Sequence, residues 1–290
     1  MQRLSTVSAL RAFAESERAA GRRLALVPTM GALHAGHLAL VGEARRRADR
    51  VLVSIFVNPT QFAPNEDLAS YPRDLDGDLE KCRRAGVDAV FAPEPAELYP
   101  PGAQTWVGVA ELSKPLCGQS RPHFFRGVAT VVAKLLIAAH PHVAVFGEKD
   151  YQQLLVVRRL ARDLLLDVEI VGVPLVRDTD GLALSSRNAH LDAAARRDAA
   201  VLPRALDAAQ AAVGEGERSA AVLLERVRKE IARAPSAELD YAELRDATTL
   251  APVETLRGPA LLALAVRFPV GPGHVRLIDN RVLLGEESPR

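Results

Sequence analysis

The stretch "VPTMGALHAGH", residues 27–37, stands where a short hydrophobic run gives way to a helical pattern. The run at 24–27 predicts a strand that the following proline ends, and the pattern after it predicts a helix over 37–48. Gly31 and Gly36 remove side chains where a ligand could approach the backbone between the two elements. The N–H groups at the start of that helix would face the same gap, which makes it a natural site for phosphate.

Two histidines in this stretch, His34 and His37, lie three residues apart and would share one face of a helical turn. Imidazole N–H groups can donate to phosphate oxygens, and one well-aimed donor is worth ~10²–10³ in rate where charge builds up. The pair could instead hold a metal, although no His-Glu-x-x-His pattern or cysteine pair supplies further ligands. Both could also be ordinary loop residues. The sequence has no Gly-x-Gly-x-x-Gly motif, so a dinucleotide oxidoreductase is not supported.

The first part of the chain alternates strand patterns with helical patterns. Buried hydrophobic runs predict strands at 51–57, 89–92, 143–146 and 168–171. Helical patterns occupy 73–85, 128–139 and 151–166, and a further amphipathic helix is expected around Leu4, Val7, Leu10 and Phe13. This order predicts an α/β fold, a Rossmann-like parallel sheet with helices on both faces. Such sheets bind ligands at the carboxyl ends of their strands.

The pattern changes after about residue 176. Helical stretches rich in alanine, arginine and leucine occupy 192–213 and 219–234. Three strand patterns follow, at 240–244, 261–268 and 275–284. Helices followed by strands indicate a smaller α+β domain. We therefore expect two domains, a nucleotide- and substrate-binding domain at 1–176 and a C-terminal domain at 177–290.

The overall composition excludes several classes of protein. With 37 basic and 36 acidic residues, the formal net charge is +1, so attraction to nucleic acid or to a membrane surface is not expected. Cys82 and Cys117 are too few for a disulfide framework or a zinc ribbon. Neither a signal peptide nor an apolar run of about 18 residues is evident, which favours a cytoplasmic location.

A second candidate segment, "FGEKDYQQ" at 146–153, also lies at the end of a predicted strand. Lys149 would project from it as a compact positive charge that suits phosphate. Asp150 with Gln153 three residues on resembles a helix capping box instead. The residues alone favour capping and ligand binding about equally.

Three further segments carry polar groups near strand ends. In "GLALSSRN", 181–188, two hydroxyls and Arg187 suit a phosphate grip, although serine and asparagine also favour caps and turns. In "FVNPTQF", 56–62, Gln61 could bind a small polar substrate through its amide. In "RPHFFRG", 121–127, two arginines precede a helix and suit a carboxylate or phosphate. Together these groups indicate a nucleotide-handling transferase, without defining its substrate.

Five segments in order, "VPTMGALHAGH", "SIFVNPTQF", "NEDLASYPRD", "VFGEKDYQQ" and "GLALSSRN", resemble the signatures of the pantothenate synthetase (pantoate–β-alanine ligase) family. The resemblance extends over about 24–188. It implies an AMP-forming ligase of pantothenate biosynthesis, on the pathway to coenzyme A. In that reaction the pantoate carboxylate attacks the α-phosphorus of ATP, giving pantoyl adenylate and pyrophosphate. The amine of β-alanine then attacks the acyl carbon and releases AMP.

The same resemblance implies roles for individual residues. It makes His37 a proton donor, with His34 and Lys149 as further catalytic groups, and it makes Gln61 and Gln153 ligands of pantoate. Magnesium is expected on the phosphates, with Asp76 and Asp78 as candidate contributors. A cytoplasmic homodimer is also implied. The implied ATP-binding residues are Met30, Gly31, Ala32, Leu33, His34, Ala35, Gly36, His37, Gly147, Glu148, Lys149, Asp150, Val176, Leu184, Ser185, Ser186 and Arg187.

One segment departs from the family pattern, and other functions remain as alternatives. The family usually has Arg-Pro-Gly-His-Phe-Arg-Gly where this chain has His123 and Phe124 in place of the glycine and histidine, so the role of that histidine does not carry over. An adenylyltransferase that stops at a dinucleotide or an adenylate would use the same histidines. A tRNA-charging enzyme would need a basic anticodon-binding extension. A nucleotide-binding regulator without activity is the alternative outside the enzymes.

Overall fold

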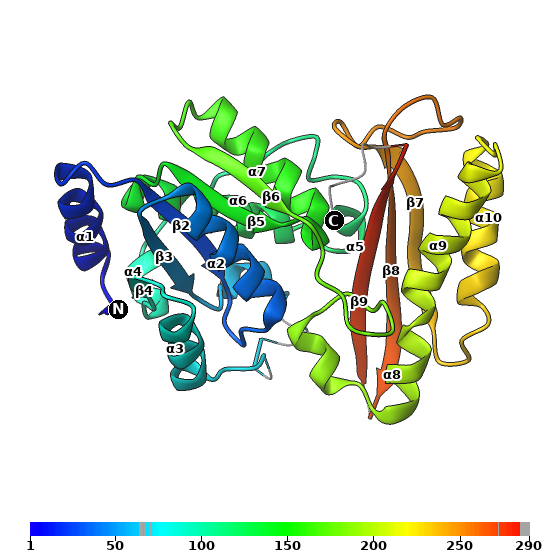
Figure 1. Ribbon diagram of the computed structural model, residues 1–290, viewed down its shortest axis with the longest axis horizontal. Helices are drawn as coiled ribbons and strands as arrows, with labels where there is room; N and C mark the ends of the chain where they lie inside the picture. The colour runs from blue at the N-terminus through cyan, green and yellow to red at the C-terminus, as the bar shows by residue number, and fades with distance from the viewer. Residues whose placement is uncertain (64–65, 67, 70, 272, 285–290) are drawn as a thin grey trace. The chain divides into compact units, whose positions relative to one another are not determined.

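The computed structural model describes residues 1–63, 66, 68–69, 71–271 and 273–284. They form two compact units, Met1–Val173 and Pro174–Arg290, which correspond to the blue-to-green and green-to-red parts of Figure 1. The predicted division after residue 176 falls just beyond this boundary, and separate folding of the two domains stays a prediction. No helix among the described residues is long and apolar enough to cross a membrane.

A six-stranded sheet forms the centre of the first unit, and all its neighbouring strands are parallel. This confirms the predicted α/β fold. The strands, in spatial order, are β1 (Gln2–Leu4), β4 (Ala89–Phe91), β3 (Arg50–Ile55), β2 (Leu24–Thr29), β5 (Val143–Gly147) and β6 (Glu169–Val173). The helices are α1 (Val7–Ala19), α2 (Ala35–Arg47), α3 (Leu75–Arg84), α4 (Pro95–Leu98), α5 (Cys117–Ser120), α6 (Phe124–Ala139) and α7 (Tyr151–Asp163), with short 3-10 turns η1 (Pro59–Gln61) and η2 (Glu148–Asp150).

Both faces of this sheet are buried, because successive side chains of a strand point to opposite faces. Leu26 and Leu52 pack into one core with α1, α6 and α7. Val27 and Val53 pack into another core with α2 and α3. Burial on both faces explains why the strands appear in the sequence as unbroken apolar runs.

The strand β2 does not stop at Pro28, so that prediction is wrong. Pro28 is paired with Ser54 of β3, and the strand continues to Thr29. Proline cannot donate to a ladder. On the other side of β2, the pairing with β5 ends at Leu26, so a missing donor two residues later breaks no bond there.

The N-terminal helix also begins later than expected. Leu4 was predicted on its apolar side but belongs to β1, opposite Phe91 of β4. The helix α1 starts at Val7, after Thr6, whose side chain accepts a hydrogen bond from the Ala9 N–H. Leu4 is nevertheless buried, because the face of the edge strand packs on the same core.

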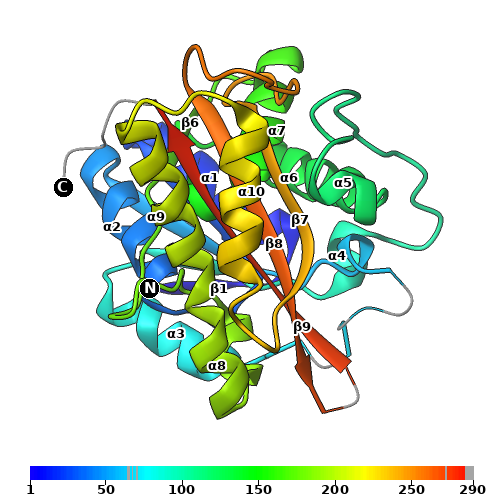
Figure 2. The ribbon, with the colours of Figure 1, turned by 90° about the vertical axis from the view of Figure 1, so that its right-hand side faces the viewer.

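The second unit contains an antiparallel sheet of β7 (Glu238–Asp246), β8 (Ala260–Val270) and β9 (Gly273–Leu283). The helices α9 (Val201–Gly214) and α10 (Ala220–Ile231) pack on one face of this sheet (Figure 2). The single helix expected over 192–213 is instead two, α8 (Ala193–Ala199) and α9, which meet at Ala200. A 3-10 turn, η3 (Ser186–His190), precedes them. The smaller α+β unit is thus as predicted.

Candidate active site

Three neighbouring strands of the first unit bring the predicted site residues of that unit to one edge of the sheet. The strand β2 lies between β3 and β5, and all three run in the same direction. Their carboxyl ends lead into the loop before α2, into η1 and into η2. His34 and His37, Gln61 and Lys149 belong to these three connections, as the parallel topology predicts.

The two histidines cap their own helix. His34 is the N-cap of α2, and its Nδ1 accepts a hydrogen bond from the Gly36 N–H at 3.1 Å. The Nδ1 of His37 accepts from the His34 N–H at 3.3 Å, and the two ring centroids are 4.1 Å apart. A neutral imidazole whose Nδ1 accepts carries its proton on Nε2. Each ring therefore presents an Nε2–H donor of fixed direction.

This arrangement corrects the expected phosphate site at the start of α2. The Gly36 N–H is bound by the imidazole of His34, and the His37 N–H donates to the His34 carbonyl oxygen at 2.9 Å. These backbone donors are engaged within the chain itself. With the Gly36 and His37 N–H groups engaged, the imidazole Nε2–H groups become the donors proposed to meet an anion at this segment.

Both imidazoles are neutral at neutral pH. Burial lowers the pKa of His34 to about 4, and the positive charges of Lys149 and Lys81 act in the same direction. Burial lowers the pKa of His37 to about 3, and His34 and the same two lysines contribute. Histidines in this state donate hydrogen bonds without carrying a positive charge. Positive charge near the rings is supplied by Lys149 and Lys81.

The loop before α2 is shaped by a carboxylate from a distant helix. Asp78 of α3 is 1% exposed, and its two oxygens accept hydrogen bonds from the Ala32 N–H and the Leu33 N–H, each at 2.7 Å. Gly31 and Ala32 both have left-handed backbone conformations, with φ of +84° and +50°. Because its oxygens are engaged in this way, Asp78 does not fit the expected role of a magnesium ligand.

The segment after β5 presents Lys149 and does not form the capping box that was one of the two alternatives for its sequence. Asp150 is the N-cap residue of α7, but its side chain makes no capping hydrogen bond, so the predicted capping box with Gln153 is not formed. Lys149 Nζ lies 3.8 Å from an Asp150 carboxylate oxygen. The neighbouring Gln152 is buried and binds the carbonyl oxygens of Leu112 and Pro115. Of the two glutamines, Gln152 is therefore structural, and Gln153 remains the predicted ligand.

Asn58 is a residue that the sequence analysis did not assign. Its amide Nδ2 donates to Gln61 Oε1 at 3.0 Å and to the Gly127 carbonyl oxygen at 3.1 Å. Its Oδ1 accepts from the Thr60 N–H at 3.3 Å. Since the oxygen of the Gln61 amide is bound to Asn58, the –NH2 end of that amide is turned away from Asn58 and can donate to a carboxylate. The signal in the sequence was an Asn-Pro pair directly after a buried strand.

The arginine of the departing segment is engaged within the chain. Arg121 Nε donates to Glu66 Oε1 at 2.7 Å, and its Nη2 donates to the Gln61 carbonyl oxygen at 3.0 Å. Its guanidinium lies 4.1 Å from the centre of the Phe124 ring. His123 is an exposed residue before α6 and makes no capping hydrogen bond. Phe124 thus packs against Arg121, and the Arg121 guanidinium, predicted to suit a carboxylate or phosphate, is paired with the Glu66 carboxylate. Arg126 was also predicted to precede the helix but lies within α6.

The remaining predicted residues belong to the second unit, where they lie on and after a hairpin-like turn. The Leu184 N–H donates to the Val176 carbonyl oxygen at 2.9 Å. Inside this turn, the guanidinium of Arg177 grips the fully buried carboxylate of Asp279 with two bonds of 2.7 and 2.9 Å. The same guanidinium donates to the Gly181 carbonyl oxygen at 2.9 Å. The turn is thereby fastened to β9.

Ser185 confirms the capping alternative for its segment. It is the N-cap residue of η3, and its Oγ accepts a hydrogen bond from the Arg187 N–H at 3.3 Å. Ser186 and Arg187 are the first two residues of that turn. Asn188 ties the turn to the hairpin, since its Nδ2 donates to the Ala183 carbonyl oxygen at 3.1 Å. A capping Oγ can still accept or donate one further hydrogen bond.

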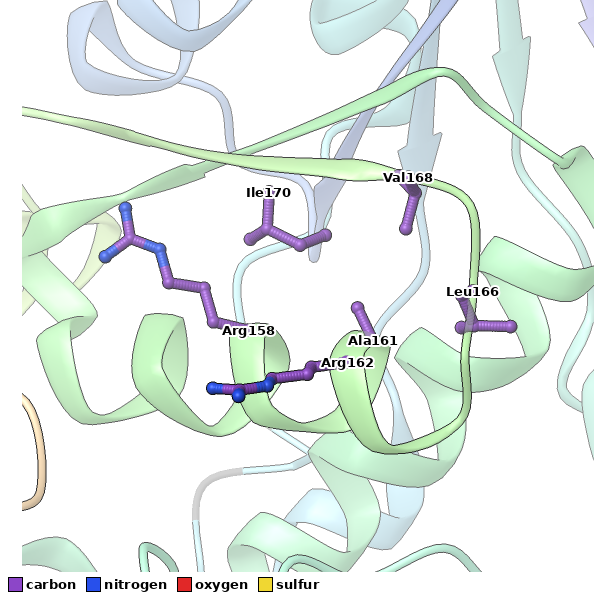
Figure 3. Close-up of a pocket in the computed structure, with 6 residues that line it drawn as sticks. All are labelled: Arg158, Ala161, Arg162, Leu166, Val168 and Ile170. Atoms are coloured by element: carbon purple, nitrogen blue, oxygen red, sulfur yellow. The ribbon is translucent and has the colours of Figure 1, made fainter.

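A separate hollow lies beside the edge strand of the first unit (Figure 3). It is lined by Arg158, Ala161, Arg162, Leu166, Val168 and Ile170. These residues come from the later turns of α7, from the connection that follows it and from the beginning of β6, whereas the predicted site residues follow the ends of the strands. The hollow contains none of those residues. Among the residues that the structure describes, no group of three or more His, Cys, Asp or Glu is placed to hold a metal ion.

Comparison with known proteins gives one family and a consistent set of relatives. The family model described as Pantoate-beta-alanine ligase matches residues 2–282. The pantothenate synthetase of Syntrophobacter fumaroxidans is 53% identical over 283 residues, which cover 98% of this chain and 99% of the relative. That of Geobacter sulfurreducens is 52% identical over 288 residues, 99% of this chain and 100% of the relative.

Solved structures show the same likeness. A pantothenate synthetase from Thermus thermophilus has a TM-score of 0.91 and 48% identity, and the match covers 97% of this chain and 99% of that one. A pantoate-beta-alanine ligase from Francisella tularensis, complexed with beta-gamma ATP and beta-alanine, has a TM-score of 0.78 and 32% identity, and the match covers 97% of each chain.

Proposed function

Because the chain belongs to the pantoate-beta-alanine ligase family, we infer that it joins pantoate to β-alanine with ATP, through a pantoyl-adenylate intermediate. Pyrophosphate and AMP are the other products. One observation supports this function more than any other. Two neutral imidazoles are fixed with their Nε2–H groups as donors, beside the positive charge of Lys149 at the carboxyl edge of the sheet.

The first half-reaction is the attack of the pantoate carboxylate on the α-phosphorus of ATP. A new phosphorus–oxygen bond forms, the bond to the β-phosphate bridging oxygen breaks, and negative charge moves onto the departing pyrophosphate. His34, His37 and Lys149 are proposed to stabilise that charge. Donors that are already oriented lose little on reorganisation, which is why they lower the barrier. With its low pKa, His37 acts here as a hydrogen-bond donor, and the proton donor implied by the resemblance is best understood in this sense.

Pantoate would be held by amide groups. Asn58 binds the oxygen of the Gln61 amide, which directs the –NH2 end towards another acceptor such as the pantoate carboxylate or hydroxyl. Gln153 is proposed as the second amide. Holding the pantoate carboxylate in line with the α-phosphorus makes the reaction between the two bound substrates effectively intramolecular.

In the second half-reaction the β-alanine amine attacks the acyl carbon of the adenylate. The carbon–nitrogen bond forms, the bond from the acyl carbon to the phosphate oxygen breaks, and AMP leaves with that oxygen while the amine loses a proton. The Francisella tularensis relative was solved with beta-alanine. The presence of beta-alanine in that complex supports β-alanine as the amine substrate of this protein.

The remaining contacts to ATP are proposals drawn from the family resemblance. The segment 30–37 and the segment 147–150 would serve the nucleotide from the first unit. Val176, Leu184, Ser185, Ser186 and Arg187 would serve it from the second unit, which we propose to be a separate domain. The N–H groups of Ala32 and Leu33 would not bind phosphate, since both already donate hydrogen bonds to the Asp78 carboxylate.

Magnesium is proposed on the phosphates of ATP, as the family resemblance implies. A homodimer in the cytoplasm is proposed from the same resemblance. Sedimentation of the purified protein would test the dimer, and a single species at the monomer mass would contradict it.

The half-reactions test the proposed function directly. Purified protein with ATP, Mg²⁺ and pantoate should release pyrophosphate, and later addition of β-alanine should yield AMP and the amide. Pantoate is the decisive component, so the matched control leaves it out and should release no pyrophosphate. Release that does not depend on pantoate would sink the ligase assignment. A dinucleotide product would favour the adenylyltransferase alternative.

A further inference from the structure

We propose that Asp78 is a positioning residue for the imidazole pair, a role that rests on the proposed function and goes beyond it. Asp78 lies in the first turns of α3, 45 and 46 residues from its two partners in the loop before α2. It is among the few buried charged residues of the chain. No step of the reaction uses it directly.

The backbone of the loop forms a cradle for an anion. Gly31 and Ala32 both have a positive φ, and the N–H groups of Ala32 and Leu33 point towards one carboxylate. It is the carboxylate of Asp78, with one oxygen on the Ala32 N–H and the other on the Leu33 N–H. The cradle that a sequence motif suggests for phosphate is therefore filled by the chain's own carboxylate.

The fit leaves no room for a second anion. A Cβ atom built on Gly31 would lie 3.0 Å from the Asp78 Oδ2 and 3.2 Å from the Ile55 Cγ2. The carboxylate is also 3.6 Å from the Lys81 ammonium, one turn further along α3. A buried carboxylate with two N–H donors and a cation is a satisfied group, so it stays in place as a fixed support.

Asp78 is connected to the histidines through the backbone of Leu33 and through one hydrogen bond between the two histidines. Leu33, whose N–H is held by Asp78, directly precedes His34 and is itself buried in the core beneath α2. The His34 N–H in turn binds the His37 Nδ1. Asp78 therefore fixes the backbone from which both rings are oriented, and through it the directions of their Nε2–H groups.

Ala32 makes this inference testable, because alanine rarely adopts a left-handed conformation without support. In Asp78→Asn the amide keeps one acceptor but turns an –NH2 group towards a backbone N–H, and the cradle should open. Ala32→Gly removes the conformational strain at the same point, since glycine adopts this conformation freely. Combining the two separates a role in stability from a role in orientation.

Three variants should be measured: Asp78→Asn, the double variant Asp78→Asn/Ala32→Gly, and Glu80→Gln as a control. Glu80 is on the same helix and pairs with Arg83 and Arg84 on the surface, so its change removes one negative charge away from the loop. The readouts are kcat and KM for pantoate-dependent pyrophosphate release, and the tautomer of each histidine from ¹⁵N NMR without substrate.

A positioning role predicts that the double variant still folds cooperatively in a urea titration but has a kcat lower by ~10² or more, the effect of a misplaced donor. The KM for pantoate should change little, and the histidines should lose their uniform Nε2–H form. The control should match the wild type in every readout.

Wild-type kcat and wild-type tautomers in the double variant would overturn the proposal and leave Asp78 with a stabilising role only. Lost kcat with unchanged tautomers would also overturn it, since Asp78 would then act without moving the rings. If the wild type itself released no pyrophosphate, the proposed function would fail, whereas the NMR readout would still decide whether Asp78 orients the imidazoles.

Discussion

Two loops, one in each unit, carry the residues proposed to meet the nucleotide, and a buried carboxylate braces each of them in a different way. Asp78 binds the backbone N–H groups of the first loop directly. Asp279 braces the second loop through the guanidinium of Arg177. The first brace binds N–H groups directly, at a place where two successive residues, Gly31 and Ala32, have an unusual backbone. The second acts through a long side chain, and its turn has a left-handed backbone only at Gly181, with φ of +85°.

The difference shows what each brace can specify. Backbone N–H groups fix the path of the chain within a few tenths of an ångström, which suits a loop whose imidazoles must point in one direction. A guanidinium fork ties two distant segments together, since Arg177 and Asp279 lie 102 residues apart. The first brace should therefore affect mainly the reaction, and the second mainly the stability of its unit.

The largest effect is expected from Arg177→Met. This change removes the cation paired with the fully buried carboxylate of Asp279, which keeps its hydrogen bond from the Asn280 N–H, and breaking a buried pair in this way costs about 3–5 kcal/mol. Hydrogen exchange of the β8 and β9 amides should show the loss in the second unit. Arg196→Met is the matched control, because ion pairs as exposed as those of Arg196 with Asp178 and Asp180 contribute little to stability. Equal losses in the two variants would remove the contrast between the loops.

The next effect is expected from His37→Ala in the first loop. Loss of one oriented donor should lower kcat for adenylate formation by ~10²–10³, while the helix loses only one capping bond. Pantoate-dependent pyrophosphate release measures the rate, and the fluorescence of Trp106 in the first unit reports its folding. His274→Ala, on the surface of β9, should leave both unchanged. An unaltered rate would show that His37 only caps α2.

A smaller effect concerns the stability of the first unit as pH falls. The pKa of His34 is about 4 in the folded protein and about 6.5 in an unfolded chain, so the unfolded chain binds more protons between these values. The stability that His34 contributes is present above pH of about 6.5 and is lost as the pH falls to about 4. Each pH unit in that window should cost at most about 1.4 kcal/mol per histidine.

His34→Asn sharpens this test, because asparagine is a good N-cap that does not titrate. In urea unfolding followed by Trp106 fluorescence, the variant should lose part of its pH dependence between about 4 and 6.5. The rest should come from His37, whose pKa is lowered to about 3. Identical pH slopes in the variant and the wild type would contradict the assignment to His34.

The smallest effects on stability are expected from single changes at Gly31 and Ala32, the two left-handed residues of the first loop. Gly31→Ala adds a Cβ atom 3.0 Å from the Asp78 carboxylate at a φ of +84°, which should destabilise the unit by about 1–3 kcal/mol. Ala32→Gly relieves strain but adds freedom to the unfolded chain, so its net effect should stay within about 1 kcal/mol. Urea titrations of the two variants give the comparison. A larger loss of unfolding free energy in Ala32→Gly than in Gly31→Ala would contradict this expected order.

The sequence predicted the elements whose signals are local. Val53 and Val27 belong to unbroken apolar runs, and such runs are enough to predict buried parallel strands. Pro28 was misleading because proline ends most strands, whereas here the partner strand on the other side stops first. The strand β1 was missed because three residues are too few to show an alternating pattern of apolar and polar side chains. The strand depends on its pairing with β4.

The site was predicted in its residue types but less well in its contacts. His34 was found from its position and Lys149 from its charge. The sequence does not say which imidazole nitrogen of His34 accepts a hydrogen bond. The contacts of Asp78 and of Asp279 join segments 45 to 102 residues apart, and one sequence holds no record of such pairs. Gln61 was found, but its orientation depends on Asn58, whose role appears only when the amide bonds are seen.

The low pKa values of His34 and His37 have a consequence for the heat of nucleotide binding. Before binding, both Nδ1 atoms are occupied by backbone N–H groups and neither ring carries a charge. A polyphosphate beside them raises the pKa of an imidazole, since an opposite charge favours the protonated form. Below neutral pH, binding of ATP would then draw protons from the buffer. The enthalpy measured by calorimetry should therefore change with the ionisation heat of the buffer, and the slope gives the net number of protons taken up by the protein and the nucleotide together.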